Sequence, residues 1–566
     1  MIERWGVNKK KDLLAVMIGR NGSDWREVYF YDLKTGEQLE DHLMHLRNAN
    51  LMLWHDGGLI YVGFDAPEEG REQLDWVSGS RVNFHKIGTD QSEDKVLTSG
   101  LVSSDGYFQT IKNDKKLLFE HEVKISGKWY RSYSYSAISS DTIIPKPLLV
   151  YPDADSISVD IAFVRGGSVF FKTTWNTPNG RVIKVDFDKP NKPVQFIPEF
   201  DVILDEVNKL GSEYVACQYN NNGQDLILIF NSKGELAKKL PFPQGKKVYG
   251  FYENREKAKS TLYDVSSFYH PTLTFRINLE DLVSEPVVSV TVPYDFDDFV
   301  TRYVHYMADD GTKIPMYITH KKNIQLNGKN PTLIYAYGGY GVKVEPSYDI
   351  YMMNWILNGG IYAVPDVRGG GGINSEWSKL GQGLNKKNGI SDLIDAAEFL
   401  IEENYTDSEY LGLNGQSHGG LLVSAAAVKR PDLFKAVIAE AGLYDMLRYE
   451  QYTIGFTSTN KKEFGSVENL EEYKSLLSYS PLHNIKKGTQ YPDFLLITGD
   501  SDNRVVPSHT YKFLATLQQD ADPKGRYILY LEEGAGHAGS TNRYDYYDTI
   551  IYKYSFLFNR LGKSLL

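Results

Sequence analysis

The chain has 566 residues, more than one hydrophobic core usually supports, so we expect two domains. It is 42% hydrophobic and 24% charged, as ordinary globular proteins are. Its formal net charge of −11 argues against a nucleic-acid partner, because a surface that binds nucleic acid carries a basic excess.

The N-terminus superficially resembles a signal peptide, since three lysines at 9–11 precede an apolar run at 13–18. That run is too short and no small-residue cleavage site follows, so we interpret residues 13–18 as a first β-strand. No apolar run reaches the length of about 18 residues that suggests a membrane helix. A single cysteine, Cys217, excludes internal disulfides and fits a reducing compartment. The sequence predicts a soluble, cytoplasmic protein.

Residues 1–290 have an all-β pattern, in which short β-rich runs alternate with polar turns about every 8 to 14 residues. Clear examples of such runs are residues 27–31, 59–62, 168–172, 182–185 and 226–230. A degenerate unit recurs at 31–37, 185–190 and 230–235, where an apolar strand leads to Asp or Asn and then to a polar turn.

The spacing of these units, near multiples of about 45 to 50 residues, predicts propeller blades of four strands each. A large β-sandwich is the alternative. At about 48 residues per blade the segment holds roughly six blades. We therefore predict a β-propeller domain over residues 1–290 with six or seven blades, and leave open that the first blade is incomplete.

From residue 291 to 566 strands alternate with helices, which is the pattern of an α/β domain. We expect strands at 331–336, 361–367, 410–413, 436–439, 494–498 and 527–531, and helices at 392–404, 421–428, 508–519 and 544–561. A mostly parallel sheet places its functional loops at the carboxyl ends of its strands. Ser417, Asp502 and His537 each lie just beyond such an end.

The motif G-x-S-x-G occurs at residues 415–419, between a short apolar strand and a small-residue helix. This is the context of a nucleophile elbow, a sharp turn that exposes the central serine. Glycines on either side of Ser417 remove the Cβ atoms that would collide in such a turn. The sequence therefore predicts Ser417 as a nucleophile.

An α/β-hydrolase places its serine, acid and histidine in that order along the chain. Of the histidines from Ser417 onward, His418 adjoins the nucleophile and its side chain would point away, while His483 precedes the expected acid. His509 lies in the first turn of a helix, where a solvated or capping role is ordinary. His537 follows the last strand in a glycine-rich loop, from which an imidazole can reach the elbow, and we predict it as the base.

Two carboxylates, Asp500 and Asp502, follow the penultimate strand. Asp500 sits where the strand ends and ordinarily bonds the turn, so we favour Asp502 as the acid. In such a triad the histidine takes the serine proton and the carboxylate fixes the histidine tautomer. The backbone N–H of His418 is the donor that the elbow geometry offers to a developing oxyanion.

Six motifs of this kind occur in order: Tyr-Ala-Tyr-Gly-Gly-Tyr at 335–340, Asp-Val-Arg-Gly-Gly-Gly at 366–371, Asn-Gly-Gln-Ser-His-Gly-Gly at 414–420, Tyr-Ser-Pro-Leu-His-Asn at 479–484, Asp-Asn-Arg-Val-Val-Pro at 502–507 and Gly-His at 536–537. Together they resemble the prolyl oligopeptidase family, serine peptidases that pair an α/β-hydrolase domain with a seven-bladed propeller. The resemblance covers most of the chain and implies the same triad.

The resemblance implies further roles. Tyr337 would donate its hydroxyl to the oxyanion, and Arg504 would bind a substrate carbonyl, with a surface ion pair as the plain alternative. The walls of the proline pocket would be formed by Tyr340, Leu443, Ile454 and Val505, for which core packing is the alternative.

Two departures concern the pocket and the elbow. The family usually carries a tryptophan shortly after the stretch at 452–455, where this chain has Ser458, and no tryptophan follows Trp377. Phe456 could supply the aromatic contact, worth about 0.5–1.5 kcal/mol, or the specificity is broader. His418 stands where the family usually has Asn, which keeps the backbone donor but changes any side-chain contact.

A third departure is the N-terminus, because relatives carry a long preceding segment that clasps the hydrolase domain and completes the first blade. Without it we expect exposed apolar surface on the hydrolase and an unpaired propeller edge. A truncated sequence and a compact six-bladed variant both stay open.

The sequence therefore predicts a monomeric serine endopeptidase that cleaves short peptides on the carboxyl side of proline through an acyl-enzyme. By the resemblance, the propeller covers the site and excludes folded proteins. The alternatives are an oligopeptidase for basic residues, an acylaminoacyl peptidase or esterase of broader specificity, a peptide macrocyclase, and a non-catalytic propeller scaffold. No metal or organic cofactor is expected, since the sequence has no His/Cys cluster of ligand type.

Overall fold

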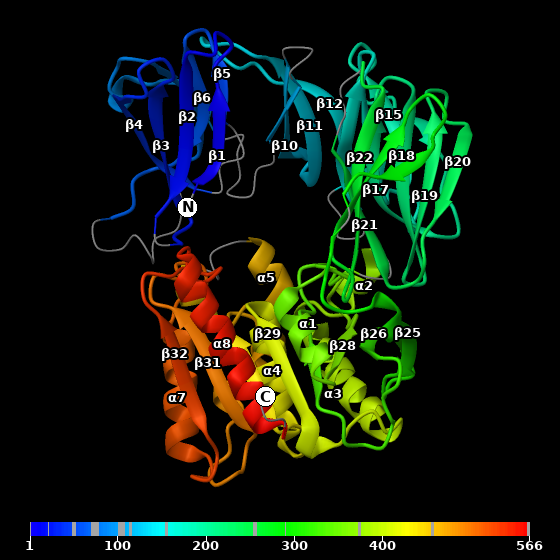
Figure 1. Ribbon diagram of the computed structural model, residues 1–566. Coiled ribbons are helices and arrows are strands. Elements are labelled where there is room, and N and C mark those ends of the chain that lie inside the picture. The colour runs from blue at the N-terminus through cyan, green and yellow to red at the C-terminus, as the bar shows by residue number, and fades with distance from the viewer. Residues whose placement is uncertain are drawn as a thin grey trace.

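The computed structural model describes residues 2–20, 22–47, 52–68, 79–99, 108–111, 116–152, 157–252, 257–288, 290–371, 375–453 and 458–562. These residues form six antiparallel sheets of four strands each, followed by one eight-stranded mixed sheet with helices on both faces. Figure 1 shows the small sheets arranged above the α/β part of the molecule.

The small sheets follow the chain in order. Their strands are β1 (Ile2–Val7), β2 (Leu13–Gly19), β3 (Trp25–Asp32) and β4 (Gln38–Arg47); β5 (Met52–His55), β6 (Gly58–Gly63), β7 (Arg81–Lys86) and β8 (Lys95–Ser99); β9 (Phe108–Ile111), β10 (Lys116–Ile125), β11 (Lys128–Ala137) and β12 (Lys146–Pro152); β13 (Val159–Arg165), β14 (Ser168–Thr173), β15 (Arg181–Asp186) and β16 (Val194–Ile197); β17 (Ile203–Leu210), β18 (Tyr214–Asn221), β19 (Gln224–Asn231) and β20 (Leu236–Pro241); and β21 (Lys246–Phe251), β22 (Ser260–Ser267), β23 (Leu273–Asn278) and β24 (Ser284–Pro286).

Repeated four-stranded meanders are the construction of a β-propeller, so the sandwich alternative is wrong. The first sheet has four strands like the others. The run at 13–18 is the second strand and not the first, because Ile2–Val7 pairs antiparallel with it. The Ile2–Val7 strand is not visible in the hydrophobic pattern because its sequence contains polar residues and a glycine.

In two of the three sequence units the side chain of the recurring Asp or Asn bonds the turn after the strand. Asp32 Oδ1 accepts the N–H groups of Lys34 and Thr35 at 2.7 and 3.1 Å. Asn231 Oδ1 accepts the N–H of Lys233 at 2.9 Å in the equivalent turn of another blade. The short side-chain acceptor adds to the backbone bonds that close these turns, such as those from Gly36 N–H to the Asp32 carbonyl and from Gly234 N–H to the Asn231 carbonyl.

The eight-stranded sheet has the order β25-β26-β28-β27-β29-β30-β31-β32. Its strands are β25 (Phe299–Met307), β26 (Lys313–Lys321), β27 (Thr332–Tyr335), β28 (Ile361–Pro365), β29 (Leu411–Gln416), β30 (Ala436–Glu440), β31 (Asp493–Gly499) and β32 (Tyr527–Glu532). The pairs from β28 to β32 are parallel, and β25, β26 and β28 pair antiparallel. This is the α/β-hydrolase arrangement that the sequence predicts.

The helices are α1 (Ile350–Leu357), α2 (Ser375–Lys379), α3 (Lys386–Glu402), α4 (His418–Lys429), α5 (Ser458–Phe464), α6 (Leu470–Tyr479), α7 (Ser508–Asp520) and α8 (Arg543–Arg560). Two of them begin earlier than expected. The first turn of α3 is polar, so its apolar period does not show there, and α4 starts directly after the elbow.

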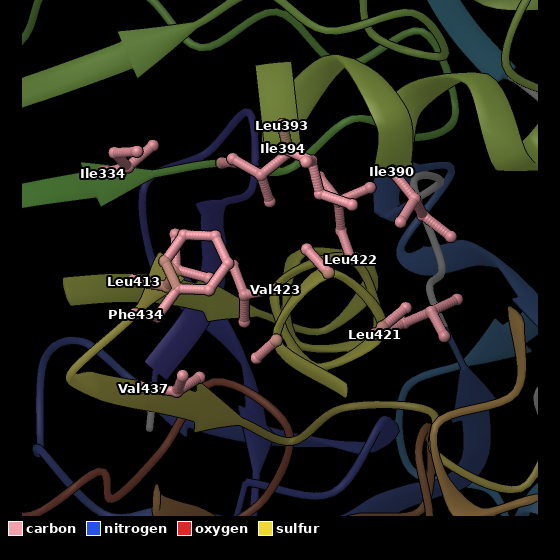
Figure 2. Close-up of a cluster of buried hydrophobic side chains, with 14 of the residues drawn as sticks. Ile334, Ile390, Leu393, Ile394, Leu413, Leu421, Leu422, Val423, Phe434 and Val437 are labelled. Carbon is pink, nitrogen blue, oxygen red and sulfur yellow. The ribbon is translucent and has the colours of Figure 1, made fainter. Parts of the chain in front are cut away.

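Alternate strand residues supply two cores, one on each face of the sheet. Val437 and Ala439 pack toward α3 and α4, whereas Ala436 and Ile438 pack toward α1 and α8. Figure 2 shows Leu422 of α4 facing α3 and Val423 facing Leu413 and Phe434 on the strand side. This packing holds the first turn of α4, and hence the elbow, rigidly against the sheet.

The outward side of α8 is exposed and aromatic. Tyr544, Ile551 and Tyr552 are 76%, 59% and 53% exposed. Within the described residues, none of the helices is both long enough and apolar enough to cross a membrane.

Candidate active site

Ser417 lies in a strained turn between β29 and α4. Its backbone angles are φ 57° and ψ −119°, and its N–H donates to the carbonyl of Glu440 at 2.8 Å. A non-glycine residue in such a conformation costs on the order of 1–3 kcal/mol, which persists only where the surroundings enforce it. Here a Cβ on Gly415 would meet the carbonyl oxygen of Gly419 at 2.3 Å. The glycines of the motif are therefore sterically required.

Asp502 and His537 form a buried hydrogen-bonded pair. His537 Nδ1 donates to Asp502 Oδ2 at 2.8 Å, and Asp502 Oδ1 accepts the N–H groups of Arg504 and Val505, both at 2.9 Å. The carboxylate is fully buried and the histidine is 8% exposed. Because Nδ1 carries the proton, Nε2 is left as the acceptor that a general base needs.

Asp500, the alternative acid, has a different role. Its Oδ1 accepts the N–H of Gly534 at 2.8 Å and the hydroxyl of Ser501 at 2.9 Å. It thus ties the end of β31 to the loop that carries His537, as expected for a turn-bonding carboxylate.

The loop of His537 lies against the elbow, since Gln416 Nε2 donates to the carbonyl of His537 at 3.3 Å. Among the described residues, the hydrogen bonds include none between Ser417 Oγ and the His537 ring. Tyr337 is close enough to Ser417 for hydrogen bonding with the serine side chain to lower the pKa of the tyrosine phenol. In substrate-free sites the nucleophile–base bond is often long and tightens when substrate binds.

Two donors face the region beyond Ser417. The Tyr337 side chain reaches the Ser417 hydroxyl, and burial raises the pKa of its phenol although that hydrogen bond lowers it. The phenol therefore remains a proton donor at neutral pH. The N–H of His418 is the first of α4, and the first N–H groups of a helix lack partners within the helix.

Arg504 is held by the propeller. Its Nε and Nη2 donate to the carboxylate of Asp24 at 3.2 and 2.7 Å. The neighbouring Asn503 accepts the N–H of Asp24 at 3.2 Å and donates to the hydroxyl of Ser23 at 3.0 Å. The guanidinium is 45% exposed, whereas the Asp24 side chain is 5% exposed. Sequence reasoning missed Asp24, because no motif marks a residue so far from Arg504 in the chain.

The expected pocket residues are brought together only in part. Leu443 and Val505 are each 1% exposed and belong to one core cluster, against which Tyr340 packs. The Tyr340 hydroxyl donates to Asn460 Oδ1 at 2.7 Å. Ile454 and Phe456 lie outside the described residues.

The solvated or capping role expected for His509 is wrong. This histidine is fully buried, its Nδ1 accepts the N–H of Asp445 at 3.1 Å, and burial lowers the pKa of its imidazole to about 4. The amphipathic pattern places it at a helix start but does not show that the preceding loops cover it. His483 bonds Ser480 Oγ at 2.8 Å, away from the triad.

Both parts of the chain match known proteins. Residues 1–290 match the model of the prolyl oligopeptidase N-terminal beta-propeller domain, and residues 346–564 match the model of the prolyl oligopeptidase family. A prolyl endopeptidase of Elizabethkingia meningoseptica is 33% identical over 533 residues, which is 94% of this chain and 74% of that protein. A prolyl endopeptidase of Dictyostelium discoideum is 28% identical, over 94% of this chain and 76% of its own length.

The solved structures agree with the sequences. One from a study of two prolyl endopeptidases superposes with a TM-score of 0.89 at 26% identity, covering 100% of this chain and 82% of that one. Prolyl oligopeptidase B from Galerina marginata, bound to a 35-residue hydrolysis and macrocyclization substrate, has a TM-score of 0.86 at 25% identity and covers 100% and 80%. With its propeller, its hydrolase sheet and these relatives, the chain belongs to the prolyl oligopeptidase family and is a serine-type peptidase.

Proposed function

We propose that the protein is an endopeptidase that cleaves short peptides on the carboxyl side of proline, with Ser417, Asp502 and His537 as its triad. The observation that carries this proposal is the Asp502–His537 hydrogen bond, buried beside a serine held at positive φ. The prolyl endopeptidase relatives support the choice of proline. We also propose residues 1–290 as the propeller domain and residues 291–566 as the peptidase domain.

The chemistry is acyl transfer. Ser417 Oγ attacks the carbonyl that follows the proline ring while His537 Nε2 takes its proton, and Asp502 stabilises the resulting imidazolium. The Tyr337 hydroxyl and the His418 N–H stabilise the oxyanion. His537 then protonates the leaving amine, and water hydrolyses the ester by the reverse sequence of proton transfers.

Arg504 binds a substrate carbonyl near the cut, and Tyr340, Leu443, Ile454, Phe456 and Val505 line the pocket in this proposal. The cytoplasmic location, the monomeric state and the lack of a nucleic-acid partner stay predictions. The location and the lack of a nucleic-acid partner are supported by the acidic composition and by the single cysteine, which is buried.

The test compares blocked Gly-Pro and Gly-Ala reporters on the wild type and on Ser417→Ala. We expect proline to be preferred at least about tenfold, since one well-fitted apolar group contributes about 1–3 kcal/mol. Ser417→Ala should fold, lose turnover and lose labelling by a fluorophosphonate. Equal rates on the two reporters would reject the proline preference, and activity in Ser417→Ala would reject the nucleophile.

A macrocyclizing activity is a second candidate, because a dual function macrocyclase-peptidase of Galerina marginata is 30% identical over 549 residues. The same acyl-enzyme would then be captured by the amine of its own peptide. Mass spectrometry of products from a 25- to 35-residue peptide would separate cyclic from linear product.

A further inference from the structure

His418 has a fully buried side chain whose contacts the proposed mechanism does not use. Its Nδ1 lies 2.7 Å from the carbonyl oxygen of Tyr337, and its Nε2 lies 3.0 Å from Nζ of Lys386. Lys386 in turn is paired with Glu463. The Lys386 and Glu463 side chains are each 1% exposed, and they come from the start of α3 and the end of α5.

These contacts fix the protonation of the imidazole. The Tyr337 carbonyl can only accept, so the proton of the neutral ring must be on Nδ1, and Nε2 is left to accept from Lys386. Nδ1 then donates to the carbonyl of Tyr337. Burial first, and the nearby charge of Lys386 second, hold the pKa of His418 well below its usual range, so the ring is neutral. Phe464 stacks on the ring with centroids 5.7 Å apart, which fixes its plane.

The Tyr337 carbonyl, which accepts the bond from His418 Nδ1, lies in a segment that needs further contacts to hold one conformation. Tyr337 follows the end of β27 and precedes two glycines, one of which, Gly338, has φ 63°. Such a segment has much conformational freedom of its own. A Cβ on Gly339 would meet the His418 ring at 2.5 Å, so the imidazole packs directly against this turn.

We propose that the His418 imidazole, held by the buried Lys386–Glu463 pair, is a positioning residue that fixes the Tyr337 hydroxyl relative to the His418 N–H. His418 would then supply one oxyanion donor, its own backbone N–H, and its side chain would position the other, the Tyr337 hydroxyl. The proposal rests on the proposed function, because it assigns Tyr337 the oxyanion role. Placing donors before reaction is what makes an oxyanion site effective.

Two substitutions of His418 distinguish its hydrogen bond to the Tyr337 carbonyl from its hydrogen bond with Lys386. The amide nitrogen of Asn lies about as far along the side chain as Nδ1, whereas the terminal atoms of Gln lie near Nε2. His418→Asn therefore keeps a donor for the Tyr337 carbonyl, and His418→Gln keeps only the contact with Lys386. We expect kcat to fall about 10- to 50-fold in His418→Gln and less than about threefold in His418→Asn, with KM little changed, because oxyanion bonds form in the transition state.

The matched control is Tyr306→Phe, which also removes a buried hydrogen bond to a main-chain carbonyl, that of Asp392 at 2.7 Å. It should lower the melting temperature without changing kcat. In a Tyr337→Phe background, His418→Gln should add less than about twofold, since two changes that act through one group are not additive. Equal kcat values for the Asn and Gln variants, or full additivity with Tyr337→Phe, would overturn the proposal.

Should His418→Gln fail to fold, the double variant Lys386→Met with Glu463→Gln removes the pair that orients the ring without leaving a buried charge. It should lower kcat severalfold, and wild-type kcat in this folded variant would overturn the proposal.

Ser417→Ala distinguishes failure of the proposed function from failure of the positioning role of His418. If that variant retains turnover, the proposed function fails. If it is inactive while the His418 variants match the wild type, only the positioning role fails.

Discussion

Asp24 of the propeller forms an ion pair with Arg504 of the α/β domain. Replacing Asp24 by Asn tests that contact. Asp24 accepts two hydrogen bonds from Arg504, and Arg47 approaches it to 3.8 Å. The Asn side chain keeps the size of the group but removes the charge that two arginines share. We expect weaker domain docking and a higher KM.

The magnitude follows from burial. A hydrogen bond to a charged group contributes about 1.5–3 kcal/mol, and breaking a fully buried ion pair costs about 3–5 kcal/mol. The Arg504 guanidinium is 45% exposed, so solvent screening reduces its share, whereas Arg47 is 8% exposed and would keep an uncompensated charge. Only the Arg504 bonds cross between the domains, so the free energy of domain docking should fall by about 1–2 kcal/mol. Arg47 and Asp24 both belong to the propeller, so the uncompensated Arg47 charge should instead lower the stability of the propeller.

The kinetic effect follows from the freed guanidinium. If Arg504 binds a substrate carbonyl, losing its orientation should raise KM about 10-fold with kcat less affected, the signature of lost uniform binding. Steady-state kinetics on a blocked Gly-Pro reporter and thermal unfolding measure the two effects. Asp141→Asn, which breaks an exposed propeller ion pair with Lys95, is the control and should change neither.

The acid side of the pH profile provides a second readout for Asp24. Burial raises the pKa of its carboxyl, but Arg504 and Arg47 outweigh burial, and the folded pKa is lowered. Its stabilising contribution is therefore present above the unfolded value of about 3.9 and is lost as pH falls through the folded pKa. Asp24→Asn should remove this loss. A variant within twofold of the wild type in KM and unchanged in melting temperature would refute the reasoning.

Three further predictions concern other parts of the molecule. Tyr337→Phe should lower kcat about 10²- to 10³-fold with little change in KM, and an unchanged kcat in steady-state assays would exclude the tyrosine from the oxyanion site. Burial lowers the pKa of His85, but its contacts with Asp94 and Asp41 outweigh burial and the folded pKa is raised. The stability that His85 contributes is thus present below the unfolded pKa of about 6.5 and is lost as pH rises through the folded pKa. His85→Gln should therefore flatten the dependence of the melting temperature on pH above about pH 6. A slope equal to that of the wild type would contradict this. Gly415→Ala places a Cβ 2.3 Å from a carbonyl oxygen, so this variant should lose activity and unfold at lower temperature, and a fully active, stable variant would show that the elbow can relax.

The sequence could suggest Ser417, Asp502 and His537 as the proposed triad because the members of such a triad are tied to chain order. An elbow motif needs a strand before it and a helix after it, and the acid and base must follow the later strands. The choice of Asp502 over Asp500 followed from the same logic, since one carboxylate ends the strand and the other lies beyond it. The structure shows Asp502, not Asp500, bonded to His537.

Contacts between distant segments could not be predicted from the sequence. Nothing in the residues around Asp24 indicates a partner near Arg504, because surface loops carry no periodic pattern. The burial of Lys386 is equally hidden, since a lysine at a polar helix start reads as solvated. Its exposure of 1% follows only from the packing of α5 over the first turns of α3 and α4.

The propeller also contacts the loops that carry the proposed base and Arg504. A Cβ on Gly536 would meet the carbonyl oxygen of Gly22 at 2.0 Å, so the loop of His537 touches the propeller backbone directly. Arg504, two residues after the proposed acid, is anchored to Asp24 on the same propeller loop. Motion that separates the domains at this edge must release both contacts together. A substitution at Asp24 therefore tests whether this propeller contact affects the loops of the proposed triad, without touching the reacting atoms.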